Sequence, residues 1–530
     1  MKKLPIGIQT FKQIIEDDCV YVDKTQHIYK LITGAKYYFL SRPRRFGKSL
    51  LLDTISEVFS GDKELFKGLW IYDSNYDFKK HPVISVDMSS MSTETPDTLK
   101  ASILSYLEMC YAKEGLNITD KSPSDAFRRF IIEISAKYNE RVIVLIDEYD
   151  KPILDHMDDY DLAEENRKVL RGFYGILKSM DPHLRFTFFT GVSRFTRTSL
   201  FSELNNLTDI TLTADYADIC GIPVESLEHY FGDHIANLST LDNFMHYDNI
   251  ADVILRWYDG YTWDGKKKLL NPFSLLSLFE IKQIESFWYT SGSPRFLIEF
   301  IKDKPESFLK LKNMEVSSRL LEAFDISKIE IEPLLFQTGY LTVKDVIIQN
   351  GPSTYRLDIP NLEVREAFTM QVLAEITDSG EALADSSYRG MRDALKTGDL
   401  NKMLDILRGL FASIPYEIHI KTEAYYHSIF YAVMTLLGFD MDAEVSTSRG
   451  RIDAVLELDE RVYVMEFKYE DCPKGASDET KRQIFNKVLS DAMGQISAKG
   501  YADKFQGSGK TIIKAAFAFL GRDEIEMIVG

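Results

Sequence analysis

The sequence predicts an α/β protein in which a mostly parallel sheet is followed by a helical region and by a second, smaller α/β unit. The chain has 530 residues, enough for several domains. Over its first 200 residues, short apolar runs alternate with segments of helical periodicity, and strands separated by helices favour a parallel sheet. From about residue 380, helical patterns give way to strands, a helix and a further strand, which predicts a compact unit with its own core.

The first strands are expected where four or five apolar residues, many of them β-branched or aromatic, stand between polar segments. We place them at residues 37–40, 83–86, 142–146 and 186–190. Helical periodicity predicts helices at residues 50–59 and 99–112. These elements make up a first domain at residues 1–215.

A helical pattern follows from about residue 216, which predicts a helical lid. Residues 339–343 and 355–357 are typical of a hairpin, compatible with a small winged-helix-like linker region. This second region is placed at residues 216–378, with its boundary near residues 377–380.

The last domain, residues 379–530, is predicted to open with helices that continue to about residue 438. Its later elements are expected to be strands at 452–458 and 461–467, a helix at 479–498 and a strand at 512–520.

Composition excludes several classes of protein. Hydrophobic residues make up 45% of the chain and charged residues 27%, as in soluble globular proteins. The four cysteines stand far apart, which excludes a disulfide scaffold and a cysteine zinc site and fits a reducing compartment. No apolar run approaches the roughly 18 residues of a membrane span, and the first apolar stretch is too short for a signal peptide. We therefore expect a cytoplasmic protein without a membrane partner.

The net charge of −18 argues against a protein that coats nucleic acid through a general positive field. Residues 481–522 nevertheless hold eight Lys or Arg and two Asp or Glu, a local balance of +6, within a last domain whose balance is −5. This stretch is either a phosphate-facing surface or a solvated helix face.

A candidate phosphate-binding loop lies at residues 41–49, between a predicted strand and a predicted helix. Lys48 is expected to reach the β- and γ-phosphates, and the Ser49 hydroxyl to hold Mg²⁺. The loop departs from the usual pattern, because Arg42 stands where its first glycine should be and Pro43 offers no amide. Arginines in the loop can add charge where backbone donors are lost.

The next predicted strand, residues 142–146, ends in two carboxylates, which supplies the second half of a nucleotide site. Asp147 is expected to coordinate Mg²⁺ through water, and Glu148 to polarise the attacking water. The strand at 186–190 ends in polar residues that could sense the γ-phosphate. Arg194 or Arg197 could stabilise the transferring charge, although an ordinary salt bridge is an equal alternative for each.

A second candidate site lies in the last domain. Glu466 and Lys468 are two residues apart on a predicted strand, so both side chains point to one face, and a hairpin partner can bring Asp453 to that face. Two carboxylates and a lysine suit a Mg²⁺-dependent phosphodiesterase, although alternating charge on an exposed strand is also common. Upstream, Glu423 and His427 share a predicted helix face.

The chain resembles the bacterial and archaeal AAA-ATPase-like proteins with a C-terminal PD-(D/E)XK nuclease-type domain. The motifs that carry this resemblance are Leu4-Pro5-Ile6-Gly7-Ile8, Tyr21-Val22-Asp23-Lys24-Thr25, the loop at residues 42–49, Leu145-Ile146-Asp147-Glu148-Tyr149-Asp150, Trp257-Tyr258-Asp259-Gly260-Tyr261, Asn271-Pro272-Phe273-Ser274 and the residues around Asp453, Glu466 and Lys468. They extend over nearly the whole chain. In this family an arginine-bearing loop is the usual form.

The resemblance implies a P-loop ATPase core with a helical lid, and a restriction-endonuclease-like last domain. Together with the residue patterns above, it gives Arg42, Arg44, Arg45, Phe46, Gly47, Lys48, Ser49, Asp147 and Arg194 as the expected nucleotide contacts, with Glu148 catalytic. In the last domain it implies Asp453 and Glu466 as metal ligands, Glu423 as an auxiliary ligand, Lys468 as the catalytic lysine, and Gln495 as a substrate or active-site contact. Lys499 shares a predicted helix face with Gln495 and is a further expected substrate contact. His427 is expected to be structural rather than a ligand.

We therefore expect ATP and Mg²⁺ (or Mn²⁺) as cofactors, nucleic acid, DNA rather than RNA, as substrate, and a nuclease controlled by the nucleotide state. One alternative is a nucleotide-dependent switch or scaffold whose nuclease-like domain binds nucleic acid or a protein without cutting. Another is a nucleotide binder that hydrolyses little. A homo-oligomer stays open, because Arg194 or Arg197 acting on a neighbour would require one.

Overall fold

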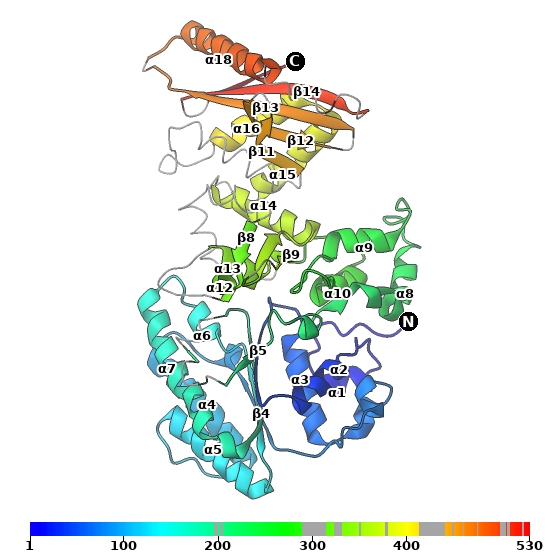
Figure 1. Cartoon of the computed structure of the whole chain (residues 1–530), viewed down its shortest axis with the longest axis vertical. Helices are drawn as coiled ribbons and strands as arrows, with labels where there is room; N and C mark the ends of the chain where they lie inside the picture. Colours follow the sequence, from blue (N-terminus) through cyan, green and yellow to red (C-terminus); the bar gives the residue numbers. More distant parts are fainter. Residues whose placement is uncertain are drawn as a thin grey trace. The chain divides into compact units, whose positions relative to one another are not determined.

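The computed structural model divides into two compact units, which are described separately (Figure 1). The first holds the residues up to Phe287 and residues 314–361, and the second holds Trp288 and the residues from Leu362 onward. The structure describes the chain except for residues 195–199, 202–203, 205, 289–313, 323–330, 349–350, 377–379, 413–439, 448–449, 459, 474, 499–504, 506–508 and 522–523. It describes the backbone alone for residues 319, 322, 372–373, 375–376, 380–381, 440–447 and 450–453. The boundary predicted near residues 377–380 falls largely outside this description, and the predicted domain limits stay predictions.

A five-stranded parallel sheet forms the centre of the first unit. Its strands, in spatial order, are β2 (Val83–Asp87), β3 (Val142–Asp147), β4 (Leu184–Gly191), β1 (Tyr37–Ser41) and β5 (Thr208–Asp209). Every residue of β1 and β3 is buried, as expected for strands covered on both faces. All four strands predicted in this region are confirmed. Because β4 lies between β1 and β3, its carboxyl end adjoins both the candidate phosphate loop and Asp147.

Helices surround this sheet and carry clear end signals. Those of the first unit's core are α1 (Phe11–Glu16), α2 (Thr25–Thr33), α3 (Lys48–Ser60), α4 (Pro96–Lys113), α5 (Pro123–Tyr138), α6 (Lys151–Leu154) and α7 (Tyr160–Ser179). Thr95 and Thr98 form a capping box at the start of α4, and the Asp159 side chain caps α7. α3 packs on β3, while α4, α5 and α7 pack on one another. The predicted helices at 50–59 and 99–112 lie within α3 and α4 and are confirmed.

A helical lid follows the sheet. It contains α8 (Leu227–Leu238), α9 (Ile250–Tyr258) and α10 (Pro272–Ile281), with a short pair of strands, β6 (Ile222–Pro223) and β7 (Leu269–Leu270). Its apolar core includes Phe231, Ile254 and Leu275, and it also takes in Val20 from the N-terminal segment. The lid therefore packs against residues that precede the phosphate loop.

A small module with a three-stranded antiparallel sheet completes the first unit, and we call it the wing. It consists of β8 (Met314–Ser317), α12 (Ser318–Glu322), α13 (Ile331–Thr338), β9 (Thr342–Ile347) and β10 (Thr354–Asp358), with strand order β8-β10-β9. The β9–β10 pairing confirms the predicted hairpin, although its first strand begins at Thr342 rather than at residue 339. The Tyr261 hydroxyl donates to Gly339 O at 2.9 Å, which ties the lid region to the wing.

The second unit is built on a five-stranded mixed sheet (Figure 1). Its elements are α14 (Leu362–Ile376), α15 (Gly380–Thr397), α16 (Leu400–Ala412), β11 (Asp440–Thr447), β12 (Gly450–Glu457), β13 (Arg461–Glu470), α18 (Asp478–Ala498), β14 (Thr511–Leu520) and β15 (Glu524–Val529), with strand order β11 to β15. Only β13 and β14 pair in parallel, as α18 connects them. The predicted strands at 452–458, 461–467 and 512–520 and the helix at 479–498 are confirmed, with ends that differ by at most three residues. The sequence did not predict β11 and β15.

The two faces of β13 differ. Val462 and Val464 lie in one apolar cluster with Leu489 and Ile496 of α18, so this face is the one that α18 covers. Tyr463 belongs to the opposite face, where its hydroxyl donates to Leu395 O of α15 at 2.7 Å. Glu466 and Lys468 continue the series of Val462 and Val464, because alternate residues of a strand share a face.

All four cysteines are free thiols. Within the described ranges, no helix is both long and apolar enough to cross a bilayer.

Candidate nucleotide and nuclease sites

The loop between β1 and α3 has the conformation of an anion-binding loop. Gly47, directly before α3, has a φ of 91°, which favours glycine, and a Cβ there would meet nothing within 4 Å, so conformation rather than space selects the residue. Arg45 is also left-handed, with a φ of 64°. The first N–H groups of the 13-residue α3 have no partner within the helix, and such an end attracts phosphate.

Lys48 lies across this loop. It is the first residue of α3, it is 4% exposed, and its Nζ donates to Arg42 O and Pro43 O at 3.1 Å each. These carbonyl contacts hold the ammonium where phosphate oxygens could take over as acceptors.

The two predicted magnesium contacts lie side by side. The Ser49 hydroxyl donates to Asp147 Oδ2 at 2.5 Å, although the two residues are 98 positions apart. The other oxygen, Oδ1, accepts from the Thr190 hydroxyl at 2.5 Å, which fixes the carboxylate in the sheet edge. A hydroxyl and a carboxylate are the oxygen donors that Mg²⁺ takes beside a phosphate, so these residues fit the ion.

Glu148 is half-buried next to this pair. Its backbone amide donates to Asp147 Oδ1 at 3.0 Å. Burial raises the pKa of its carboxyl, and the nearby Lys48 ammonium acts in the opposite direction. The Glu148 carboxylate, which is near the predicted phosphate position, therefore binds a proton more tightly than an ordinary glutamate does.

Arg42 has a structural environment that the sequence did not predict. Its side chain is fully buried, and Nη1 donates to Ser41 O at 2.9 Å and Thr211 O at 2.8 Å. Nη2 donates to Tyr216 O at 3.2 Å, and the guanidinium lies 4.0 Å from the centre of the Trp263 ring. With its donors directed at carbonyls inside the protein, this geometry does not support the prediction that Arg42 contacts the nucleotide.

The other loop residues divide between solvent and the lid. Arg44 and Arg45 are exposed, and the Arg45 guanidinium lies 3.8 Å from the centre of the Phe273 ring. Phe46 is fully buried and packs edge-on against Tyr261, with ring centres 4.8 Å apart. Of the three arginines, only these two present guanidinium groups to solvent, where phosphate could meet them.

Arg194 forms the ordinary ion pair that was one of its two predicted alternatives. Its Nη2 donates to Asp209 Oδ2 at 2.6 Å, and both side chains are at least nine-tenths buried. The pair bridges the segment after β4 to β5. Arg197 lies outside the described residues.

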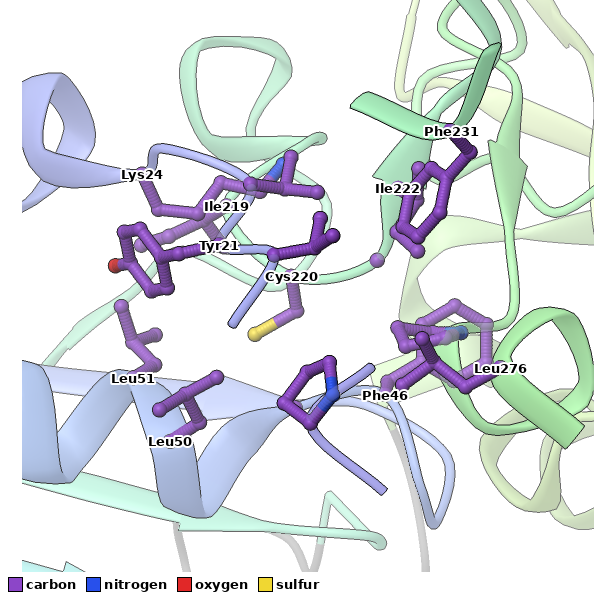
Figure 2. Close-up of a pocket in the computed structure, with 16 residues that line it drawn as sticks. Tyr21, Lys24, Phe46, Leu50, Leu51, Ile219, Cys220, Ile222, Phe231 and Leu276 are labelled. Atoms are coloured by element: carbon purple, nitrogen blue, oxygen red, sulfur yellow. The ribbon is translucent and has the colours of Figure 1, made fainter. Parts of the chain in front are cut away.

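A mostly apolar pocket adjoins the loop and was missed by sequence reasoning (Figure 2). Its empty volume is about 610 Å³, open mouth included, within the range of small-molecule sites. Three segments line it: the N-terminal region with Pro5, Val20, Tyr21, Val22 and Lys24, the loop and its helix with Phe46, Gly47, Leu50 and Leu51, and the lid side with Ile219–Ile222, Phe231, Pro272 and Leu276. Burial lowers the pKa of Lys24 to about 8, and its Nζ donates to Asp218 O at 2.7 Å. A pocket of this size and polarity beside a phosphate loop could hold the flat, largely apolar ring of a nucleobase.

In the second unit, the structure brings Glu466 and Lys468 together. Lys468 Nζ lies 3.3 Å from Glu466 Oε1, with side chains 22% and 2% exposed. Ala454 of β12 pairs with Met465 of β13, and Asp453 and Glu466 are the residues next to this pair along the two antiparallel strands. The Asp453 side chain lies outside the description.

The remaining predicted nuclease residues are placed less directly. Lys481, in the first turn of α18, forms an ion pair with Glu524, so this helix begins near the end of β13 and runs antiparallel to it. The last turn, with Gln495, therefore lies toward the beginning of β13, and this placement gives no support to a role for Gln495 beside Lys468. Glu423, His427 and Lys499 lie outside the described residues.

The basic stretch at 481–522 is partly neutralised. Lys481 pairs with Glu524, and Lys510 Nζ lies 2.7 Å from Glu457 Oε1. Arg482 and Lys487 are exposed on α18. Both predicted alternatives, a phosphate-facing surface and a solvated helix face, stay open for these two residues.

Comparison with known proteins agrees with this division of sites. Residues 5–201 match the AAA-ATPase-like family, described as predicted AAA-ATPase, and residues 421–527 match the PD-(D/E)XK nuclease superfamily. An Azotobacter chroococcum mcd 1 protein, named as an uncharacterized protein in the vnfD 5′ region, is 36% identical over 518 residues, which cover 96% of this chain and 95% of that protein. The chain belongs to the AAA-ATPase-like family with a PD-(D/E)XK domain.

Membership of this family gives the pocket a context. The AAA-ATPase match begins at residue 5, so it includes Pro5, Tyr21, Val22 and Lys24, which belong to the motifs that carry the resemblance and line the pocket. Those motifs were the available signal for this pocket, but they did not show that the N-terminal segment folds back onto the loop helix. The lid residues of the pocket lie beyond that match and within the span shared with the Azotobacter protein.

Proposed function

We propose that the chain binds and hydrolyses ATP in its first unit and cuts nucleic acid, DNA rather than RNA, in its second, with cleavage controlled by the nucleotide state. The observation that carries the nuclease is the buried carboxylate of Glu466 with Lys468 at 3.3 Å. Asp453 is the residue before Ala454, which pairs with Met465 next to Glu466. Burying a carboxylate is costly unless charged partners compensate. A binding site for a divalent cation accounts for the free-energy cost of burying this carboxylate better than a surface without a ligand does.

At the nucleotide site, each residue group has a separate task. The apolar pocket takes the adenine base, and the α3 amides with Lys48 hold the phosphates. Ser49 and Asp147 are the oxygen ligands suited to Mg²⁺. Glu148 orients the attacking water and accepts its proton. Mg²⁺, when bound, neutralises charge on the phosphates and helps the leaving group depart.

At the nuclease site, Asp453 and Glu466 are the carboxylates suited to Mg²⁺ or Mn²⁺, and Lys468 orients the attacking water or takes its proton. When bound, such an ion lowers the pKa of coordinated water and stabilises the leaving oxygen. Lys468 is suited to its task because it is a cation held against Glu466 on the same strand face. Glu423, Gln495 and Lys499 stay candidates for auxiliary contacts.

The alternative is a nucleotide-dependent switch whose second unit binds nucleic acid or a protein without cutting. The exposed Arg482 and Lys487 on α18 would serve such binding equally well. Activity, rather than binding, therefore decides between the two functions.

The test is cleavage of labelled single- and double-stranded DNA and RNA by the full chain, with Mg²⁺ or Mn²⁺ and with or without ATP. We expect cleavage of DNA by the wild type and a loss of about 100-fold or more in Lys468→Ala, since a catalytic acid–base group contributes at least that much. Lys510→Ala, a partly exposed lysine of the same unit, is the matched control and should cut normally. Nucleotide turnover without cleavage of any substrate would favour the switch.

A further inference from the structure

The carboxyl end of β4 is fixed by buried hydrogen bonds from the segment that carries the catalytic carboxylates. Asp150, which is 1% exposed, accepts from the Ser193 amide at 2.6 Å, and the Tyr149 hydroxyl donates to Ser193 O at 3.0 Å. A Cβ at Gly191 would lie 2.5 Å from Asp150 Oδ1, so the strand end and the Asp150 side chain are in close contact. A shift of this strand end would therefore displace the residues that follow Glu148.

From there the contacts continue to the root of the phosphate loop. Arg194 pairs with Asp209, whose other carboxylate oxygen accepts from the Thr211 amide at 2.8 Å. Thr211 in turn accepts at its hydroxyl from the Ser41 amide at 3.0 Å and at its carbonyl from Arg42 Nη1 at 2.8 Å. These bonds form one connected path from the end of β4 to the start of the loop.

One side chain of the wing enters this path. Gln337, near the end of α13, is 3% exposed, and its Oε1 accepts from the Arg194 amide at 2.9 Å. Its Nε2 donates to Leu321 O of α12 at 3.2 Å. The two partners fix the orientation of the amide, because an N–H needs an acceptor and a carbonyl needs a donor. Gln337 thus links both wing helices to the backbone between β4 and β5.

We propose that Gln337 is a positioning residue through which the wing sets the geometry of the ATPase site. The inference rests on the proposed ATPase function. Gln337 holds the Arg194 backbone, and Arg194 with Asp150 holds the strand end beside Asp147 and Glu148. By linkage, any change at the nucleotide that moves this strand end also acts on α13.

The expected effect is on turnover more than on binding. ATP is held by the loop amides, Lys48 and the base pocket. The two hydrogen bonds of the Gln337 side chain go to Arg194 and Leu321 instead. Loss of one buried hydrogen bond at the strand end is expected to lower kcat about tenfold and to leave the ATP Kd within about twofold.

The experiment compares Gln337→Leu, Gln337→Glu and the wild type in the full chain. Leucine removes both hydrogen bonds. The glutamate variant keeps an acceptor for the Arg194 amide, although a carboxyl in this buried place lowers stability at least as much as leucine does. Asn361→Leu is the control, because Asn361 is a buried amide of the same unit whose Nδ2 donates to Asp259 O at 2.7 Å, away from β4. The measurements are ATP turnover, ATP affinity and hydrogen exchange at the Arg194 amide.

We expect turnover to fall in Gln337→Leu, to recover in Gln337→Glu, and to stay near normal in Asn361→Leu. Exchange at the Arg194 amide should rise about tenfold or more in the leucine variant alone. Equal turnover in all variants, or losses that follow stability instead, would overturn the positioning role. A wild type that binds ATP without hydrolysing it would refute the proposed ATPase, and the exchange measurement would then still decide whether Gln337 holds the strand end.

Discussion

Glu148 stands in a backbone conformation that residues with a side chain seldom adopt. Its φ of 46° lies in the left-handed region, which costs a non-glycine residue on the order of 1 kcal/mol. The turn is tied to the site, because the Glu148 amide bonds to the carboxylate of Asp147. Strain of this kind persists where surrounding contacts impose it, and here it directs a carboxylate with a raised pKa toward the candidate phosphate position.

Glu148→Gln tests this residue alone, since it keeps the side-chain shape and removes its basicity. We expect kcat for ATP to fall about 100-fold or more, the usual contribution of a general base, while the ATP Kd changes by less than about twofold. Single-turnover hydrolysis and equilibrium binding measure the two quantities. Glu165→Gln, the same substitution at an exposed position of α7, should behave as the wild type. Undiminished hydrolysis in Glu148→Gln would rule out its catalytic role.

Individual residues were predictable where a local pattern places them. Ser49, Asp147 and Glu148 each follow a strand or a Gly-Lys pair in the sequence, and the pairing of Ser49 with Asp147 follows from the parallel sheet. The partners of Arg194 were not predictable. Asp209 reaches it only because β5 joins the sheet beside β1, and Gln337 only because the wing packs on the same edge 143 positions later. No local periodicity encodes either contact.

At the scale of elements, the phosphate loop combines two kinds of arginine. Arg42 is buried and stabilises the loop, because its guanidinium donates to the Thr211 and Tyr216 carbonyls and lies over the Trp263 ring. Burial lowers the pKa of its guanidinium to about 10, which leaves it charged at neutral pH. Arg44 is exposed. The loop therefore gains its shape from Arg42, and its surface charge from Arg44 together with the exposed Arg45.

This division predicts opposite phenotypes for two substitutions in one loop. Arg42→Met leaves buried carbonyls without donors and should lower the free energy of unfolding of the first unit by about 2–5 kcal/mol. Arg44→Ala should leave stability unchanged and weaken ATP binding about fivefold, as expected when one partly screened phosphate contact is lost. Urea unfolding and ATP titration distinguish the two. An Arg42→Met variant with wild-type stability and weakened ATP binding would restore Arg42 as a nucleotide ligand.

The strands of the second unit show which elements a sequence reveals. The central strands β13 and β14 are buried apolar runs and were predicted, whereas β11 and β15 were not. Both missed strands lie at the edges of the sheet, and β11 carries three acidic residues among its eight. Edge strands bear polar and charged residues that discourage further pairing, so their apolar signal is weak. Their existence follows from pairing with β12 and β14 rather than from local pattern.

At the scale of the whole molecule, the two proposed activities belong to different compact units, each with a core of its own. ATP bound between the N-terminal segment, the loop helix and the lid would hold these three parts of the first unit together. Nucleotide control of cleavage requires more, because a ligand shifts an equilibrium only by its differential affinity for two states. The second unit must therefore cut at different rates in the states that ATP distinguishes.

Lys48→Ala isolates that coupling, because it removes a phosphate contact and leaves the second unit intact. In the wild type we expect ATP to change the cleavage rate about fivefold or more, the lower end of usual allosteric couplings. Lys48→Ala should cut at one rate with or without ATP, equal to the wild-type rate without nucleotide. Lys151→Ala, a lysine of α6 that pairs with Asp155, is the matched control and should respond to ATP as the wild type does. If the wild-type cleavage rate is the same with and without ATP, the two sites act independently. If ATP still changes the cleavage rate of Lys48→Ala, the controlling nucleotide binds at another site.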